Sequence, residues 1–186
     1  MTRRKNDSYM SADWMTHFLL ERTPVQITGT ALEPCCGDGA ISNALKHYGF
    51  DVTTCDINPA CSPDICADYL EADFSFPGQD WIITNPPFSL AYPMLLKALS
   101  EVTVGVAFLL RLSFVEPTEE RGDWLEANPP TGRITLPRYS FTGNGKTDSV
   151  TAEWMVWFKD KAIPQFNSVV SKNSLRDWIR NNGRQN

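Results

Sequence analysis

The chain is organised around one stretch, residues 80–88, which reads Asp80-Trp81-Ile82-Ile83-Thr84-Asn85-Pro86-Pro87-Phe88. Its first half predicts a short buried strand, because Trp, Ile and Thr favour β-structure. Pro86 and Pro87 then end the strand, since each lacks a backbone N–H and has a fixed φ. Pro86 also biases Asn85 towards an extended backbone. We therefore expect a stiff loop at a strand end that presents an amide, unpaired carbonyls and an aromatic ring, which suits a flat group carrying an NH2.

A second informative stretch precedes it, with an expected strand at 28–34, a loop at 35–40, a helix at 40–48 and a strand at 51–55. Gly37 and Gly39 allow the loop to turn sharply and to approach a ligand closely. Asp56 follows about 20 residues on, where a carboxylate can accept hydrogen bonds from ribose hydroxyls. Ser42 stands where a dinucleotide fingerprint requires a third glycine, which disfavours NAD. The pattern predicts a βαβ unit that binds a nucleoside without a pyrophosphate.

The segments Glu33-Pro34-Cys35-Cys36-Gly37-Asp38-Gly39 and Asn85-Pro86-Pro87-Phe88 resemble the class I S-adenosylmethionine-dependent methyltransferases, above all short phage and bacterial DNA adenine-N6 methyltransferases. The resemblance implies an α/β, Rossmann-like fold with a mostly parallel seven-stranded sheet, helices on both faces and an antiparallel last strand. It implies S-adenosyl-L-methionine as cofactor and S-adenosyl-L-homocysteine as product. The implied enzyme is an adenine-specific DNA methyltransferase that modifies the exocyclic N6 amine.

The resemblance also implies three groups of site residues. The catalytic loop would be Asn85, Pro86, Pro87 and Phe88. The cofactor would contact Glu33, Pro34, Cys35, Gly37, Gly39, Asp56, Ile57, Asp73, Phe74 and Asn85. The target base and its flanking phosphates would contact Phe88, Arg138, Tyr139, Phe141 and Lys146, which combine charge with aromatic faces. We expect no metal site, because the cysteines at 55, 61 and 66 lack paired spacing and a nearby histidine.

The rest of the chain predicts further elements of one domain spanning residues 1–186. We expect helices at 11–22, 90–99, 116–127 and 174–182, and strands at 69–72, 102–110, 134–141 and 150–158. The last two strands would form a hairpin, with 131–149 as a possible target-recognition segment. Residues 171–186 would form a basic helix and tail.

Charge is unevenly distributed along the chain. Residues 6–131 hold five Lys and Arg against 18 Asp and Glu, whereas residues 132–186 hold nine against four. An acidic centre suits a cationic cofactor, and a basic last third suits a phosphate backbone. The expected partner is therefore DNA, either double-stranded with base flipping or single-stranded, and RNA is possible.

The expected compartment is the cytoplasm of a bacterial or phage-infected cell. Five cysteines, an odd number, fit a reducing environment, and no apolar run follows the basic residues at 3–5 as a signal peptide would require. The longest apolar run, 102–110, is too short to span a bilayer, so no membrane association is expected. A monomer is the favoured oligomeric state.

Two other functions stay open at this point. The same loop occurs on enzymes that methylate RNA bases or the amide of protein glutamine, since both substrates present a planar NH2. From another class, the chain could be a non-catalytic module that binds the cofactor or DNA.

Overall fold

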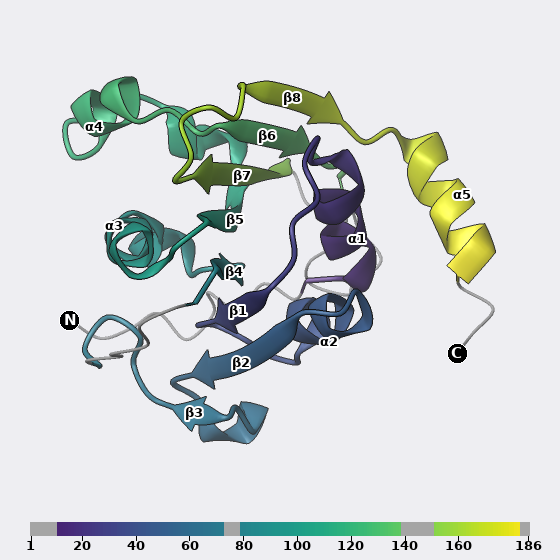
Figure 1. Cartoon of the computed structure of the whole chain (residues 1–186), viewed down its shortest axis with the longest axis horizontal. Helices are drawn as coiled ribbons and strands as arrows, with labels where there is room; N and C mark the ends of the chain where they lie inside the picture. Colours follow the sequence, from purple (N-terminus) through teal and green to yellow (C-terminus); the bar gives the residue numbers. More distant parts are fainter. Residues whose placement is uncertain (1–10, 73–78, 139–150, 183–186) are drawn as a thin grey trace.

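The computed structural model describes residues 11–72, 79–138 and 151–182, and within them the chain forms one twisted sheet with helices on both faces (Figure 1). The strand order is β3-β2-β1-β4-β5-β7-β6-β8. The strands are β1 (Thr30–Glu33), β2 (Asp51–Asp56), β3 (Ile65–Cys66), β4 (Trp81–Thr84), β5 (Gly105–Arg111), β6 (Gly132–Thr135), β7 (Ala152–Phe158) and β8 (Phe166–Val169). The α-helices are α1 (Asp13–Arg22), α2 (Ala40–His47), α3 (Ala91–Glu101), α4 (Gly122–Ala127) and α5 (Lys172–Asn182).

Strand directions confirm the predicted fold class. β3, β2, β1, β4 and β5 pair in parallel, and β7 enters antiparallel between β5 and β6. The expected strand at 150–158 is thus the antiparallel one, and it forms the expected antiparallel pair with β6. The described sheet has eight strands rather than seven, because β8 adds in parallel to the outer edge of β6.

Two hydrophobic cores lie on opposite faces of the sheet. On one face α1 and α2 contribute Trp14, Phe18 and Leu45, and α5 rests against the same core through Leu175 and Trp178. On the other face α3 and α4 contribute side chains such as Met94, Leu95 and Leu125. β5 is buried from Gly105 to Leu110, which explains its unbroken apolar sequence: a strand covered on both faces has no solvent side.

Two local predictions were wrong. The segment 69–72 is a turn rather than a strand, because Asp68 O accepts from the backbone N of Ala72 at 2.9 Å and closes the chain on itself. The third strand is instead the short β3. The helix expected at 116–127 begins only at Gly122, since a 3-10 turn, Leu112–Val115, follows β5 and Glu116 then has extended backbone angles.

Gly105 allows β5 and β7 to approach each other at the start of the central pair. A Cβ on Gly105 would lie 2.7 Å from the Trp157 carbonyl oxygen and 2.8 Å from the Trp81 ring. Neither group can move easily, because both belong to buried strands. We expect Gly105→Ala to lower the free energy of unfolding by about 1–3 kcal/mol, the usual cost of overpacking.

Urea unfolding measures this effect, and Gly122→Ala is the matched control. A Cβ on Gly122 would make only ordinary contacts with Pro117 at 3.4 Å, and helical alanine is favoured over glycine. A Gly105→Ala midpoint equal to that of Gly122→Ala would contradict the packing described for the central strands.

Candidate functional site

Three of the predicted catalytic and cofactor residues, Glu33, Asp56 and Asn85, lie on one edge of the sheet. β2, β1 and β4 are neighbours and run in parallel, so their carboxyl ends meet. Glu33 ends β1, Asp56 ends β2, and Asn85 directly follows β4. In α/β sheets such an edge is where ligands bind, in the crevice beyond the strand ends.

The loop between β1 and α2 is shaped by its two glycines. Gly37 has φ +50° and Gly39 has φ +83°, both in the left-handed region that favours glycine. The backbone N of Gly37 donates to Asp56 Oδ2 at 3.0 Å, and the backbone N of Asn58 donates to Asp56 Oδ1 at 2.8 Å. No described atom lies within 4 Å of a Cβ built on Gly37, so this loop borders open space. Asp56 thus ties the glycine loop to the loop that follows β2.

Glu33 is a buried carboxyl with an unused acceptor. Its side chain is 1% exposed, and among the described residues Oε2 has no hydrogen-bond partner. Burial raises the pKa of Glu33 well above its usual value, against the opposing effect of hydrogen bonds from Ser42. A cation brought beside Oε2 would favour the ionised carboxylate and satisfy the orphaned oxygen. An ammonium group on a ligand would meet that requirement.

The Asn85 loop is held from two directions. Pro86 is buried, and Asn85 Nδ2 donates to Ser11 Oγ at 3.2 Å, which joins the loop to the segment before α1. Phe88 begins a 3-10 turn, Phe88–Leu90, and the Phe88 ring is half-buried. The Arg111 guanidinium carbon lies 4.4 Å from the centre of the Phe88 ring. Amide and ring are therefore anchored separately.

Some of the other predicted residues lie in the described part of the chain, and the rest lie outside it. Pro34 is buried behind the glycine loop, Cys35 is half-buried beside it, and Ile57 is 47% exposed directly after Asp56. Arg138 is exposed after β6, and its Nε donates to Thr151 Oγ1 at 3.4 Å. The remaining predicted residues lie outside the described part of the chain: Asp73, Phe74, Tyr139, Phe141 and Lys146.

Sequence reasoning missed Ser11 and Arg111 as neighbours of the catalytic loop. Ser11 is 74 residues from Asn85, and only the packing of the segment before α1 over the strand ends brings it there. Arg111 follows from the sheet register, because β5 continues three residues beyond Phe108, the partner of Thr84 at the end of β4. A parallel β4–β5 pair was predictable, but the relative lengths of the two strands were not.

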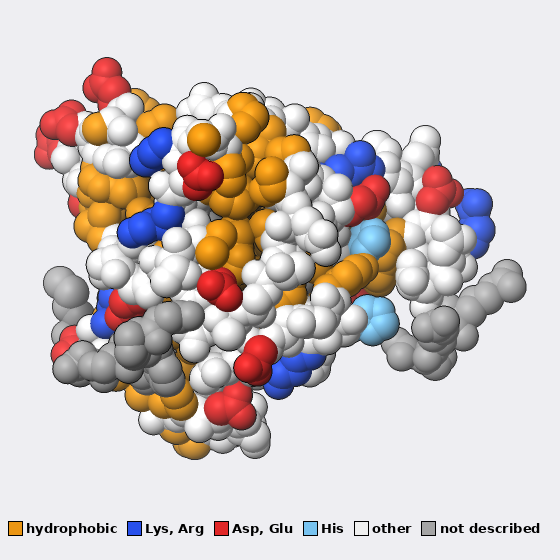
Figure 2. Space-filling view, viewed as in Figure 1, with side chains coloured by type: hydrophobic (Ala, Val, Ile, Leu, Met, Phe, Trp, Pro, Cys, Tyr) orange, Lys and Arg blue, Asp and Glu red, His pale blue; other side chains and the backbone are white. Residues whose placement is uncertain are grey.

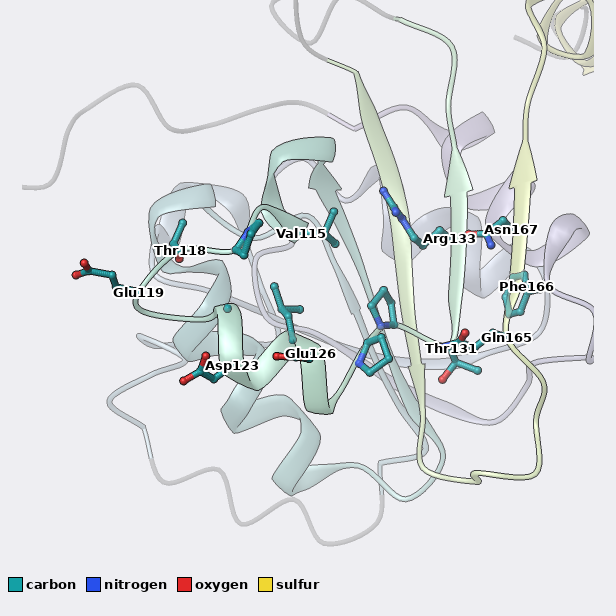
Figure 3. A pocket seen from close by; sticks show the side chains of 15 residues that line it. Val115, Thr118, Glu119, Asp123, Glu126, Thr131, Arg133, Gln165, Phe166 and Asn167 are labelled. Atoms are coloured by element: carbon teal, nitrogen blue, oxygen red, sulfur yellow. The ribbon is translucent and has the colours of Figure 1, made fainter.

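A separate cavity of about 720 Å³ opens beside α4 and the starts of β6 and β8 (Figure 3). Its lining includes Glu119, Asp123 and Glu126, together with Phe166 and with Thr131 and Arg133 from the start of the predicted recognition segment 131–149. It includes none of the individually predicted catalytic, cofactor or substrate residues. Figure 2 shows acidic side chains gathered over this α4 region. Such a wall repels phosphate, so we do not assign the substrate to it.

No protein-family model and no curated protein matches the chain. Several solved structures, in contrast, are similar to the chain. A putative class I S-adenosylmethionine-dependent methyltransferase from Listeria monocytogenes has a TM-score of 0.64 at 12% identity, over 96% of this chain and 72% of that one. A modification subunit of a putative type I restriction enzyme from Vibrio vulnificus has a TM-score of 0.61 at 10% identity, over 96% of this chain and only 53% of that one. A dimethyladenosine transferase from Plasmodium falciparum has a TM-score of 0.61 at 12% identity, over 83% and 64% of the two chains.

These likenesses define the fold: the chain has the architecture of the class I S-adenosylmethionine-dependent methyltransferases. Identities of 10–12% carry no information on substrate. In the described ranges, no helix combines the length and apolar character needed to cross a bilayer.

Proposed function

We propose that the protein is an S-adenosylmethionine-dependent methyltransferase that acts on the N6 amine of adenine in DNA. One observation carries the proposal: Asn85, in its Asn-Pro-Pro-Phe loop, lies at the strand edge that also holds the glycine loop and the orphaned Glu33 oxygen. The fold shared with the solved methyltransferase structures supports the methyl-transfer part of the proposal, and the Asn-Pro-Pro-Phe loop carries the choice of adenine in DNA.

The chain's residues fit the proposed cofactor. The open space at Gly37 admits a ligand against the backbone, Asp56 offers carboxylate oxygens to ribose hydroxyls, and Glu33 offers Oε2 to an ammonium. The adenine end would contact Asp73 and Phe74, by the family resemblance. When bound, the cofactor supplies a methyl group on a sulfonium, which is electrophilic without further activation.

The proposed chemistry requires two acceptors and a stacked ring. An adenine amine is a poor nucleophile, because its lone pair is delocalised into the base. The Asn85 Oδ1 atom and the Pro86 carbonyl would accept from its two hydrogens and draw the nitrogen towards a tetrahedral form. Phe88 would stack on the base and fix its distance from the methyl group.

Transfer would then occur in line and in one step: the N–CH3 bond forms as the S–CH3 bond breaks, and the alkylated amine loses a proton to water. No strong base is needed, because the amine becomes acidic only once it is alkylated. Cys36 is disfavoured as a thiol nucleophile, since burial raises its pKa to about 12. A base inside a duplex cannot reach the loop, so the target is flipped out or single-stranded.

We propose that residues 1–186 act as one methyltransferase domain, with residues 131–149 reading the target. Arg138 would contact phosphate, together with Tyr139, Phe141 and Lys146. The basic segment 171–186, which includes α5, would lie along the nucleic-acid backbone. A test of the proposed activity incubates the protein with tritiated S-adenosylmethionine and unmethylated plasmid DNA; we expect N6-methyladenine in nucleoside digests, and its absence at high enzyme concentration would refute the proposal.

Ser11 offers a test of how Asn85 is oriented. The hydrogen bond from Asn85 Nδ2 to Ser11 Oγ fixes the orientation of the amide, and in the proposed mechanism this orientation directs Oδ1 at the target amine. We expect Ser11→Ala to lower kcat about 2–12-fold, the value of one hydrogen bond, and Ser11→Thr to retain most of the rate.

The matched control is Ser11→Ala made in an Asn85→Asp background. A carboxylate has two equivalent oxygens and needs no such orientation, so the effect of Ser11→Ala on kcat should shrink there. Equal losses in both backgrounds would show that Ser11 does not set the orientation of the amide.

A further inference from the structure

Arg111 occupies an unusual place relative to the proposed catalytic loop. β4 ends its pairing at Thr84, opposite Phe108, whereas β5 continues to Arg111 and so extends past the strand end from which the loop leaves. The Arg111 guanidinium reaches the Phe88 ring, and both side chains are half-buried. Two residues separated by 23 positions thus meet over the start of the 3-10 turn, Phe88–Leu90.

The contact is closer than other cation–ring contacts between described residues. The distance from charge to ring centre is 4.4 Å for Arg111 and Phe88, against 5.9 Å for Arg22 and Phe18. It is 5.2 Å for Arg121 and Phe114. The guanidinium lies within cation–π distance of the ring, and because a guanidinium is planar it can also stack on an aromatic face.

The contact with Arg111 restricts the orientation of the Phe88 ring. Phe88 is partly buried and packs against the core that contains α3. Stacking by Arg111 adds a second constraint on the ring plane. A fixed plane matters to stacking with a nucleobase, because the ring then needs no reordering when the base arrives.

We propose that Arg111 is a positioning residue that holds the Phe88 ring in the plane on which the target base stacks. The inference rests on the proposed function, in which Phe88 receives the base. Arg111 acts through Phe88 and not by contacting phosphate. Its replacement therefore affects the target and not the cofactor, and it leaves the salt dependence of DNA binding unchanged.

A double-mutant cycle on kcat/KM for DNA tests this. We expect Arg111→Ala to lower kcat/KM about 3–30-fold through both kcat and KM, in line with the strength of a cation–π contact. Arg111→Lys keeps the charge without the planar stack and should recover only part of the loss. In a Phe88→Ala background, Arg111→Ala should cost less than about 2-fold, because no ring remains to be positioned.

The salt dependence separates positioning from direct phosphate binding. A residue that neutralises one phosphate reduces the slope of log K against log salt by about 1 when it is removed. We expect the same slope for wild type and Arg111→Ala. Additive effects of the two substitutions, or a reduced slope, would overturn the inference while leaving a methylating wild type, and hence the proposed function, intact.

A spectroscopic readout makes the inference testable without turnover. In protein with labelled Phe rings, the NMR signal lost in Phe88→Ala identifies Phe88, and Arg111→Ala should shift it. Arg22→Ala, which removes a cation from above Phe18, is the matched control and should leave the Phe88 signal unchanged. An unshifted signal in Arg111→Ala would overturn the inference, whereas a shifted signal in a protein that methylates no DNA would count against the proposed function alone.

Discussion

Asn85→Ala is expected to reduce methyl transfer by at least about 10²–10³-fold while leaving cofactor affinity and folding nearly unchanged. The reason is a separation of roles. Asn85 projects from the end of β4, whereas Glu33, Gly37 and Asp56 come from the ends of β1 and β2. The cofactor would be held mainly by the other loops, and the Asn85 amide would act mainly on the target amine. Its loss therefore removes an interaction that is made in the transition state.

Single-turnover rates on DNA, together with calorimetric titration of S-adenosylhomocysteine, measure the two effects separately. Asn85→Asp should keep part of the rate, since a carboxylate is also an acceptor. Asn128→Ala is a matched control, because the Asn128 amide donates to the Trp124 carbonyl at 3.0 Å, after α4. An Asn85→Ala protein that methylates at the wild-type rate would remove the amide from the mechanism.

Asp56→Ala is expected to weaken cofactor binding by about 1.5–3 kcal/mol, or about 10–150-fold in Kd. Asp56 accepts from the backbone N of Gly37 and of Asn58, so its loss releases both loops around the proposed ribose site. The variant also loses the carboxylate that would accept from the ribose hydroxyls. Both effects act on cofactor affinity before any chemistry.

Calorimetry with S-adenosylhomocysteine measures this loss, and Asp56→Asn should fall between wild type and Asp56→Ala, because an amide keeps one acceptor oxygen. Asp51→Ala is the control from the exposed start of the same strand. If Asp56→Ala and Asp51→Ala bind with the wild-type Kd, Asp56 does not contribute to a cofactor site.

Much of the fold could be predicted from the sequence, because the local preferences of these segments agree with the positions they take in the folded protein. The stretch at 80–88 became β4 and its proline-ended loop, the glycine loop joined β1 to α2, and the apolar run at 102–110 became β5. In each case a strong breaker or an unbroken apolar run marks the boundary. The antiparallel pairing of β6 and β7 followed from two strand-like segments that flank the polar, glycine-rich stretch at 142–148.

The missed elements depend on contacts distant in sequence. β8 alternates exposed and half-buried residues, and it is recognisable only from the fit of the Phe166 ring over Gly132, where a Cβ would lie 2.0 Å from the ring. The turn at 69–72 contains Tyr69, which resembles a strand residue, but its buried hydroxyl donates to Glu101 at the end of α3. Neither contact has a local sequence signal.

The candidate site was predictable to the same degree. Glu33, Asp56 and Asn85 converge because parallel neighbouring strands bring their carboxyl ends together, which follows from the predicted topology. The orphaned Glu33 oxygen, the Ser11 contact and the Arg111 stack depend on side-chain packing, and a single sequence contains no pattern for them.

The most direct test offers wild-type protein a mixture of DNA, RNA and unmethylated protein, with S-adenosylmethionine labelled in its methyl group. The mixture is then separated, and the methylated product is identified by mass spectrometry of nucleosides and amino acids, with Asn85→Ala as the inactive control. We predict that label enters the DNA as N6-methyladenine and that Asn85→Ala abolishes it. Label found only in RNA bases or in glutamine would contradict the account. So would the absence of label from every pool when the protein binds S-adenosylhomocysteine.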